Sequence, residues 1–105
     1  MPKTLNNLNT RLRREPDQVQ VSGELSFSSV LAIRDAGIHY INQVTEPVFN
    51  CNKVTKADSA GVALLIDWWR YATLAKKEIC FIHLPNRMIA LIKVGNLEDI
   101  LGVTA

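Results

Sequence analysis

One stretch of the chain decides its fold: Val54-Thr55-Lys56-Ala57-Asp58-Ser59-Ala60-Gly61-Val62-Ala63-Leu64-Leu65. Asp58 and Ser59 favour the start of a helix, because their side-chain oxygens can accept a hydrogen bond from a free backbone N–H. Beyond them, apolar residues recur at helical spacing toward Lys77, where cations complement the negative end of a helix dipole. The stretch predicts a helix from Ser59 or Ala60 to about Lys77, entered through a polar connection at residues 52–56.

Shorter patterns on either side of this stretch complete the order of elements. Ser26 or Ser28 is expected to cap an earlier helix, and Asn86 and Asn96 to cap two later ones. The expected elements are strands at 10–14 and 18–22, a helix at 28–42, a strand at 48–51, the helix already described, a strand at 79–84, and helices at 86–94 and 97–101. This order predicts an α/β fold, with a mixed sheet of about four strands covered by about four helices.

Length and charge limit the function classes. With 105 residues the chain is expected to form one domain at 11–105, preceded by a flexible tail at 1–10. The net charge is only +2, which argues against a dedicated nucleic-acid binder. The cluster Arg11, Arg13 and Arg14 is expected to lie on a solvated edge strand. Neither a secretory leader nor a membrane span is visible, so we expect a cytoplasmic protein.

The two cysteines, Cys51 and Cys80, predict neither a disulfide framework nor a metal site. Cys80 and His83 share a ligand-like spacing, but residues three apart on a strand point to opposite faces. Both cysteines are expected to be buried structural residues. No cofactor or metal is expected.

An enzyme needs a nucleophile, a base and a group that orients them. Asp58 and Ser59 have no histidine tied to them in the sequence. His39 is expected within a helix and His83 on a core strand, each without a neighbouring partner. No phosphate-cradling glycine loop is present either. The sequence therefore predicts a protein that is not an enzyme.

The segment at 54–65 resembles the signature of STAS domains, in which Asp, a small hydroxyl residue, a small residue and Gly lead from a strand into an apolar helix. Val21-Ser22-Gly23-Glu24-Leu25 resembles the earlier Gly-x-Leu element of the family. The element order matches over residues 11–102. The resemblance implies a STAS-like fold, and it is closest to the MlaB subunit of bacterial phospholipid ABC transporters.

The sequence departs from one branch of the family at Ala60. In anti-sigma-factor antagonists the phosphorylated serine directly precedes the glycine, whereas Ala60 precedes Gly61 here. The hydroxyl lies one position earlier, at Ser59, as in MlaB-like sequences. Ser59 is the remaining candidate for phosphorylation. Plain helix capping also explains Asp58 and Ser59.

The helix after the signature carries two apolar stripes at helical spacing. The first, Val62, Leu65, Ile66, Trp69 and Ala72, is expected to pack on the sheet. The second is Leu64, Trp68, Tyr71 and Ala75. Either the second stripe is buried under neighbouring helices, or it forms a partly exposed ridge for a partner protein; we expect the ridge, because Trp and Tyr are favoured interface anchors. A homodimer through the helix from Asp58 to Ala75 is the other contact that this ridge suggests.

The resemblance implies a cytoplasmic accessory subunit that binds and regulates the ATPase of an MlaB-type lipid transporter at the inner membrane. The alternative is an antagonist that binds a kinase-type anti-sigma factor. The residues expected to contact the partner are Glu24, Leu25, Ser26, Asp58, Ser59, Ala60, Gly61, Leu64, Trp68 and Tyr71.

Overall fold

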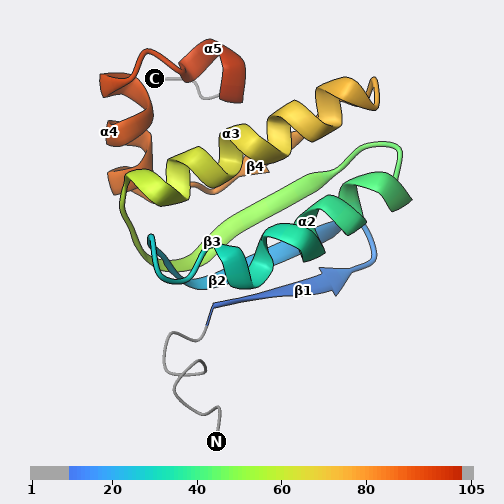
Figure 1. Cartoon of the computed structure of the whole chain (residues 1–105), viewed down its shortest axis with the longest axis horizontal. Coiled ribbons are helices and arrows are strands. Elements are labelled where there is room, and N and C mark those ends of the chain that lie inside the picture. Colours follow the sequence, from blue (N-terminus) through green and yellow to red (C-terminus); the bar gives the residue numbers. More distant parts are fainter. Residues whose placement is uncertain (1–9, 103–105) are drawn as a thin grey trace, which may run out of the picture.

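Four strands form one mixed sheet in the computed structural model, which describes residues 10–102 (Figure 1). They are β1 (Arg11–Glu15), β2 (Gln18–Leu25), β3 (Val48–Ala57) and β4 (Cys80–Ile82), and they lie in the order β1-β2-β3-β4. β1 pairs antiparallel with β2, while β2, β3 and β4 run parallel. The predicted α/β fold with a mixed four-stranded sheet is confirmed.

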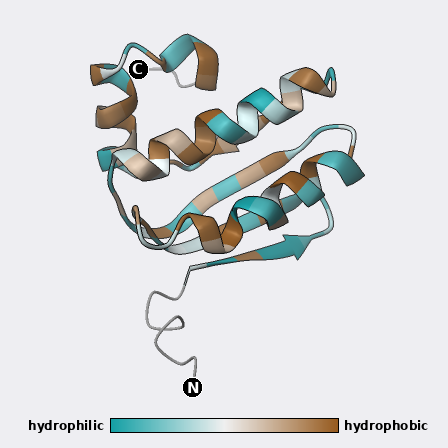
Figure 2. Cartoon of the chain, in the orientation of Figure 1, coloured by the Kyte–Doolittle hydropathy of each residue, from teal (hydrophilic) through white to brown (hydrophobic). Residues whose placement is uncertain are grey.

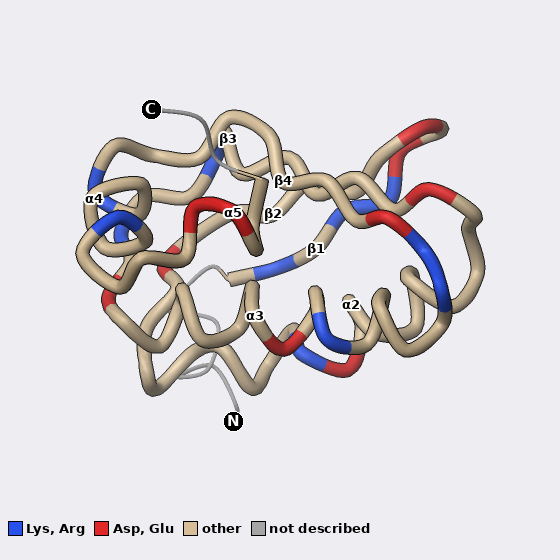
Figure 3. Tube along the Cα trace, turned by 90° about the horizontal axis from the view of Figure 1, so that it is seen from above, with Lys and Arg blue, Asp and Glu red and all other residues tan. Residues whose placement is uncertain are grey.

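The helices are α2 (Leu31–Gln43), α3 (Ser59–Leu74), α4 (Asn86–Val94) and α5 (Glu98–Leu101). Figures 1 and 3 show α2 and α3 side by side on one face of the sheet. α4 and α5 pack against α3. Within residues 10–102, no helix is both long and apolar enough to cross a membrane.

The core lies between the sheet and the pair α2 and α3. Apolar residues recur along both helices and along β3 in Figure 2. The ring of Phe49 on β3 lies at its centre, stacked on Trp68 and in edge contact with Tyr40. Gly37 on α2 makes this packing possible, because a Cβ built there would lie 2.3 Å from the Trp68 ring. The two helices can therefore approach closely only where a glycine faces the indole.

The predicted strand at 48–51 is too short, since β3 continues to Ala57. The predicted second strand also extends further, to Leu25. The register between β2 and β3 shifts twice, once between Gly23 and Glu24, and Gly23 has a φ of 90°. Along β3, the simple alternation of buried and exposed residues stops after Cys51. The second half of this strand, residues 52–57, therefore has the sequence pattern of a loop.

Several predicted helix boundaries also need correction. α2 begins after Val30 with no side-chain cap, so neither Ser26 nor Ser28 caps it. α3 ends at Leu74, before the predicted end near Lys77. Two residues later, Lys76 has a left-handed φ of 60°. α4 spans the predicted residues, but its cap position is Pro85 and Asn86 is its first residue. Likewise, Leu97 rather than Asn96 precedes the short α5.

The predictions for the cysteines and His83 hold only in part. Cys51 is buried, as predicted, and burial raises the pKa of its thiol to about 12. Cys80 is exposed, because β4 is an edge strand with only three residues. His83 lies after β4 rather than in it; it is exposed and has a φ of 55°.

Candidate partner-binding surface

Asp58 links the ends of two strands to the start of α3. Its carboxylate accepts a hydrogen bond from the Ala60 N–H at 2.8 Å, which is the predicted helix cap. Its own backbone N–H donates to the Leu25 carbonyl at 3.1 Å. The predicted loop residues from the end of β2 therefore lie beside those that begin α3.

Gly61 is buried against this junction instead of facing solvent. A Cβ at Gly61 would lie 3.0 Å from the Leu25 Cβ and 3.1 Å from the Leu25 carbonyl oxygen. Leu25 is itself fully buried. Of the predicted contact residues, Leu25 and Gly61 therefore hold the loop in place and offer no accessible surface to a partner.

The turn after β2 is held by its serines. The Ser29 hydroxyl donates to the Glu24 carbonyl at 2.6 Å and accepts the Ser26 N–H at 2.9 Å. Ser29 is buried, whereas Phe27 in the same turn is 84% exposed. Leu31, one helical turn further on, is 76% exposed. The turn thus presents two large apolar side chains to solvent.

Phe27 and Leu31 were not among the residues predicted from the sequence. The residues that precede them in the sequence lie near the start of α3. Ser26, before Phe27, lines a cavity with Asp58, and Val30, before Leu31, lines another with Ala60. A single Phe within Ser26-Phe27-Ser28-Ser29 is the signal that could have identified this turn, since a polar turn gives an aromatic ring nothing to pack on.

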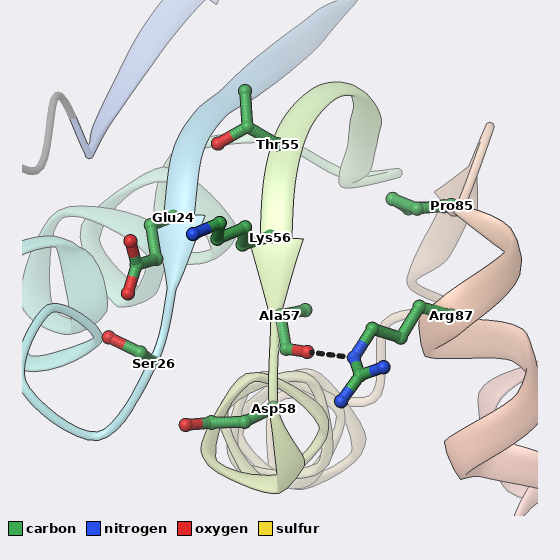
Figure 4. A pocket seen from close by; sticks show the side chains of 8 residues that line it. All are labelled: Glu24, Ser26, Thr55, Lys56, Ala57, Asp58, Pro85 and Arg87. Carbon is green, nitrogen blue, oxygen red and sulfur yellow. Dashed lines mark hydrogen bonds between the residues drawn. The ribbon is translucent and has the colours of Figure 1, made fainter.

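A cavity of about 440 Å³ opens at the carboxyl ends of β2 and β3 (Figure 4). Figure 4 shows Glu24 and Ser26 on the β2 side and Pro85 and Arg87 on the α4 side, with Lys56 and Asp58 between them. The Arg87 Nε donates to the Ala57 carbonyl at 3.0 Å, which ties α4 to the residue before Asp58. Within residues 10–102, the four charged groups around this cavity form no ion pair with one another.

The prediction of an exposed second stripe on α3 is wrong for its central residues. Leu64 is 3% exposed and Trp68 is fully buried, because α2 covers them. The Trp68 indole N–H donates to the Arg34 carbonyl on α2 at 3.0 Å. Only Tyr71 and Ala75, toward the end of the helix, reach solvent. Leu64 and Trp68 are part of the core, so the four residues do not form the predicted ridge.

The accessible residues of the two segments joined at this junction are together called the strand-end surface. They are the exposed Phe27, Leu31, Asp58 and Ser59 and the half-buried Glu24, Ser26 and Ala60. The Ser59 hydroxyl forms no hydrogen bond within residues 10–102. In the described part of the chain, no group of three potential metal ligands occurs.

Comparison with known proteins identifies the fold family. The family model described as "Mlab, STAS domain" matches residues 8–102. The chain belongs to the MlaB-type STAS domain family. A comparison with curated proteins finds no match.

Two solved structures share the fold of this STAS domain. The Bacillus cell fate determinant SpoIIAA in its phosphorylated form is 22% identical, with a TM-score of 0.64 and 86% of each chain covered. The anti-sigma factor antagonist SpoIIAA in its unphosphorylated form is 20% identical, with a TM-score of 0.68, and the match covers 86% of this chain and 83% of that one. As a STAS domain, the chain is a protein-interaction module.

Proposed function

We propose that this STAS domain is a non-catalytic accessory subunit that binds and regulates the ATPase of an MlaB-type phospholipid ABC transporter. The observation that carries the proposal is the exposed Phe27, in the turn that follows Leu25, whose carbonyl accepts the Asp58 N–H, in a chain that belongs to the MlaB-type family. Through this ATPase, the chain would be held at the cytoplasmic side of the inner membrane.

The strand-end surface has the composition of a protein interface. Exposed Phe27 and Leu31, four residues apart in the sequence, supply apolar area that a partner can cover. Glu24, Asp58 and Ser59 supply the polar groups that a protein interface also contains. The loop is also rigid, because Asp58 and Ser29 are hydrogen-bonded to neighbouring backbone. A rigid surface of this kind loses little conformational entropy when a partner binds.

Regulation follows from binding by population shift. A bound subunit can change the ATPase's activity only if it contacts one of the ATPase's conformations better than another. No chemical step on this chain is needed for such regulation. The expected effect of adding the chain is a changed rate of ATP hydrolysis by the ATPase.

Co-purification tests this proposal. The tagged chain is purified from its native cells, and the proteins that accompany it are identified by mass spectrometry. We expect an ABC-type ATPase, lost with Ser59→Asp and kept with Thr73→Asp, an exposed position on the same helix. An acidic residue at the start of α3 favours the helix dipole, so lost binding by Ser59→Asp would not reflect unfolding.

The second candidate is an antagonist that binds a kinase-type anti-sigma factor. It is favoured by the shared fold with SpoIIAA, which is known in phosphorylated and unphosphorylated forms. Against it stands Ala60, which occupies the position of the usual phosphoacceptor before Gly61. An anti-sigma kinase in the purified complex, with one phosphate added to Ser59, would establish this candidate and contradict the first.

A further inference from the structure

A groove runs between α2 and α3, next to the strand-end surface. Its volume is about 380 Å³. It is lined by Val30, which directly precedes α2, by Arg34 on α2, and by Ala60, Ala63, Leu64, Ile66, Asp67 and Arg70 on α3. Ala63 is exposed, and Val30, Ala60 and Ile66 are half-buried. The groove is therefore open to solvent along a largely apolar floor.

The walls of the groove are fixed relative to one another. The Arg34 guanidinium on α2 pairs with the Asp67 carboxylate on α3 and lies 5.7 Å from the centre of the Tyr71 ring. The Asp67 hydrogen bond raises the pKa of Arg34, so this guanidinium stays charged at physiological pH. Because the Trp68 indole also bonds to the Arg34 carbonyl, α2 and α3 cannot easily close over the groove.

The two ends of the groove differ in chemistry. Val30 and Ala60, at the starts of the two helices, form an apolar end, and the exposed Leu31 directly follows Val30 in the sequence. At the other end, Arg70 is exposed and forms no ion pair within residues 10–102. An occupant that complements both ends carries an apolar side and a carboxylate near Arg70.

We propose that this groove receives an amphipathic α-helix of the ATPase, with its apolar side on Val30, Ala63 and Ile66 and an acidic residue at Arg70. The inference rests on the proposed function and specifies what the partner presents. A helix fits because both walls are helices whose backbone groups are bonded internally. An extended peptide would find no strand edge there and would leave its own N–H groups unpaired.

Small residues on the floor let such a helix approach. Ala60 and Ala63 lie on the face of α3 that lines the groove. Helices with small residues at their contact can pack at the short end of the roughly 8–10 Å range of interaxial distances. A large side chain at position 63 would therefore block the groove without disturbing the buried core.

Calorimetric titration of the purified ATPase with the chain tests the groove. Ala63→Phe is expected to weaken binding at least about tenfold, while Ala90→Phe, at an exposed alanine of α4, leaves it unchanged. Arg70→Glu is expected to weaken binding about tenfold, as loss of one interfacial ion pair does, and Arg13→Glu on β1 serves as its charge-matched control.

Hydrogen exchange on the ATPase identifies the occupant. We expect protection of one amphipathic helix by the wild-type chain, and loss of that protection with Ala63→Phe. Protection of a loop or strand instead, unchanged binding by both variants, or a second copy of this chain in the groove would overturn the assignment. If the ATPase binds but the groove variants have no effect, only the groove assignment fails; if the ATPase does not bind at all, the proposed function fails with it.

Discussion

The indole of Trp68 on α3 stacks on the phenyl ring of Phe49 on β3, with centroids 4.4 Å apart and an interplanar angle of 21°. The indole also donates a hydrogen bond to α2 through the Arg34 carbonyl. Trp68 thus contacts the sheet and the neighbouring helix at once. This position gives it a structural role in place of the partner-binding role that the sequence suggested.

Replacement of Trp68 should therefore reduce stability. Trp68→Ala removes a fully buried ring, and we expect a loss of roughly 3–5 kcal/mol in the free energy of unfolding. Urea denaturation followed by circular dichroism measures it. Tyr71→Ala, near the end of the same helix and partly exposed, should cost much less. A Trp68→Ala protein as stable as wild type would show that the ring is not buried.

Two substitutions distinguish the capping hydrogen bond of Asp58 from the negative charge of its carboxylate. Asp58→Asn keeps a side-chain oxygen for the Ala60 N–H, so stability should change little. Asp58→Ala removes the cap and should cost about 1 kcal/mol. Thermal unfolding of both variants checks this. If Asp58→Asn retains stability but weakens ATPase binding, the carboxylate itself takes part in the contact; equal stability of the two variants would contradict the cap.

The two cysteines should differ in reactivity. Cys80 is exposed and Cys51 is buried, so a disulfide reagent such as DTNB should modify one thiol rapidly in the native protein. Cys80→Ser should abolish that rapid phase, and full denaturation should expose both thiols. Rapid modification of two thiols in the native wild type would contradict the burial of Cys51.

The raised pKa of the buried Cys51 thiol also predicts that the folded protein loses stability at alkaline pH. Its folded pKa of about 12 lies above that of an unfolded cysteine, so the folded state holds its proton more tightly. This contribution is complete below the unfolded pKa and is lost as the pH rises toward 12. Above pH ~9, the free energy of unfolding is expected to fall by about 1.4 kcal/mol per pH unit. Cys51→Val should lack this slope when denaturation is followed across that range, whereas Cys80→Ser should keep it.

Sequence patterns predicted the helices better than the strands. α3 and α4 have strong apolar periodicity with clear flanking residues, and both were located to within a few residues. The second half of β3 was missed because Asn52, Lys53 and Lys56 are exposed on a sheet strand, where they resemble a polar connection. The register shifts against β2 hid the remaining alternation.

The sequence predicted the helix start at the candidate site but not which side chains are exposed around it. The Asp58 cap depends on local sequence and was found. Exposure depends on which elements cover which, and helical spacing alone could not show that α2 covers Leu64 and Trp68 while leaving Phe27 uncovered. Both stripes of α3 look equally apolar in the sequence, so the arrangement of α2 had to be known before either could be assigned to a partner.

The strand-end surface is tested most directly by the affinity of the purified ATPase for two variants, measured by isothermal titration calorimetry. Phe27→Asp and Val94→Asp each place a carboxylate at an apolar position that is more than four-fifths exposed, 84% and 82% respectively, so neither should unfold the chain. We expect Phe27→Asp to weaken binding at least about tenfold. Val94→Asp, on α4, should bind as wild type does. Wild-type affinity of Phe27→Asp, or equal losses for both variants, would contradict the assignment of this surface as the site where the ATPase binds.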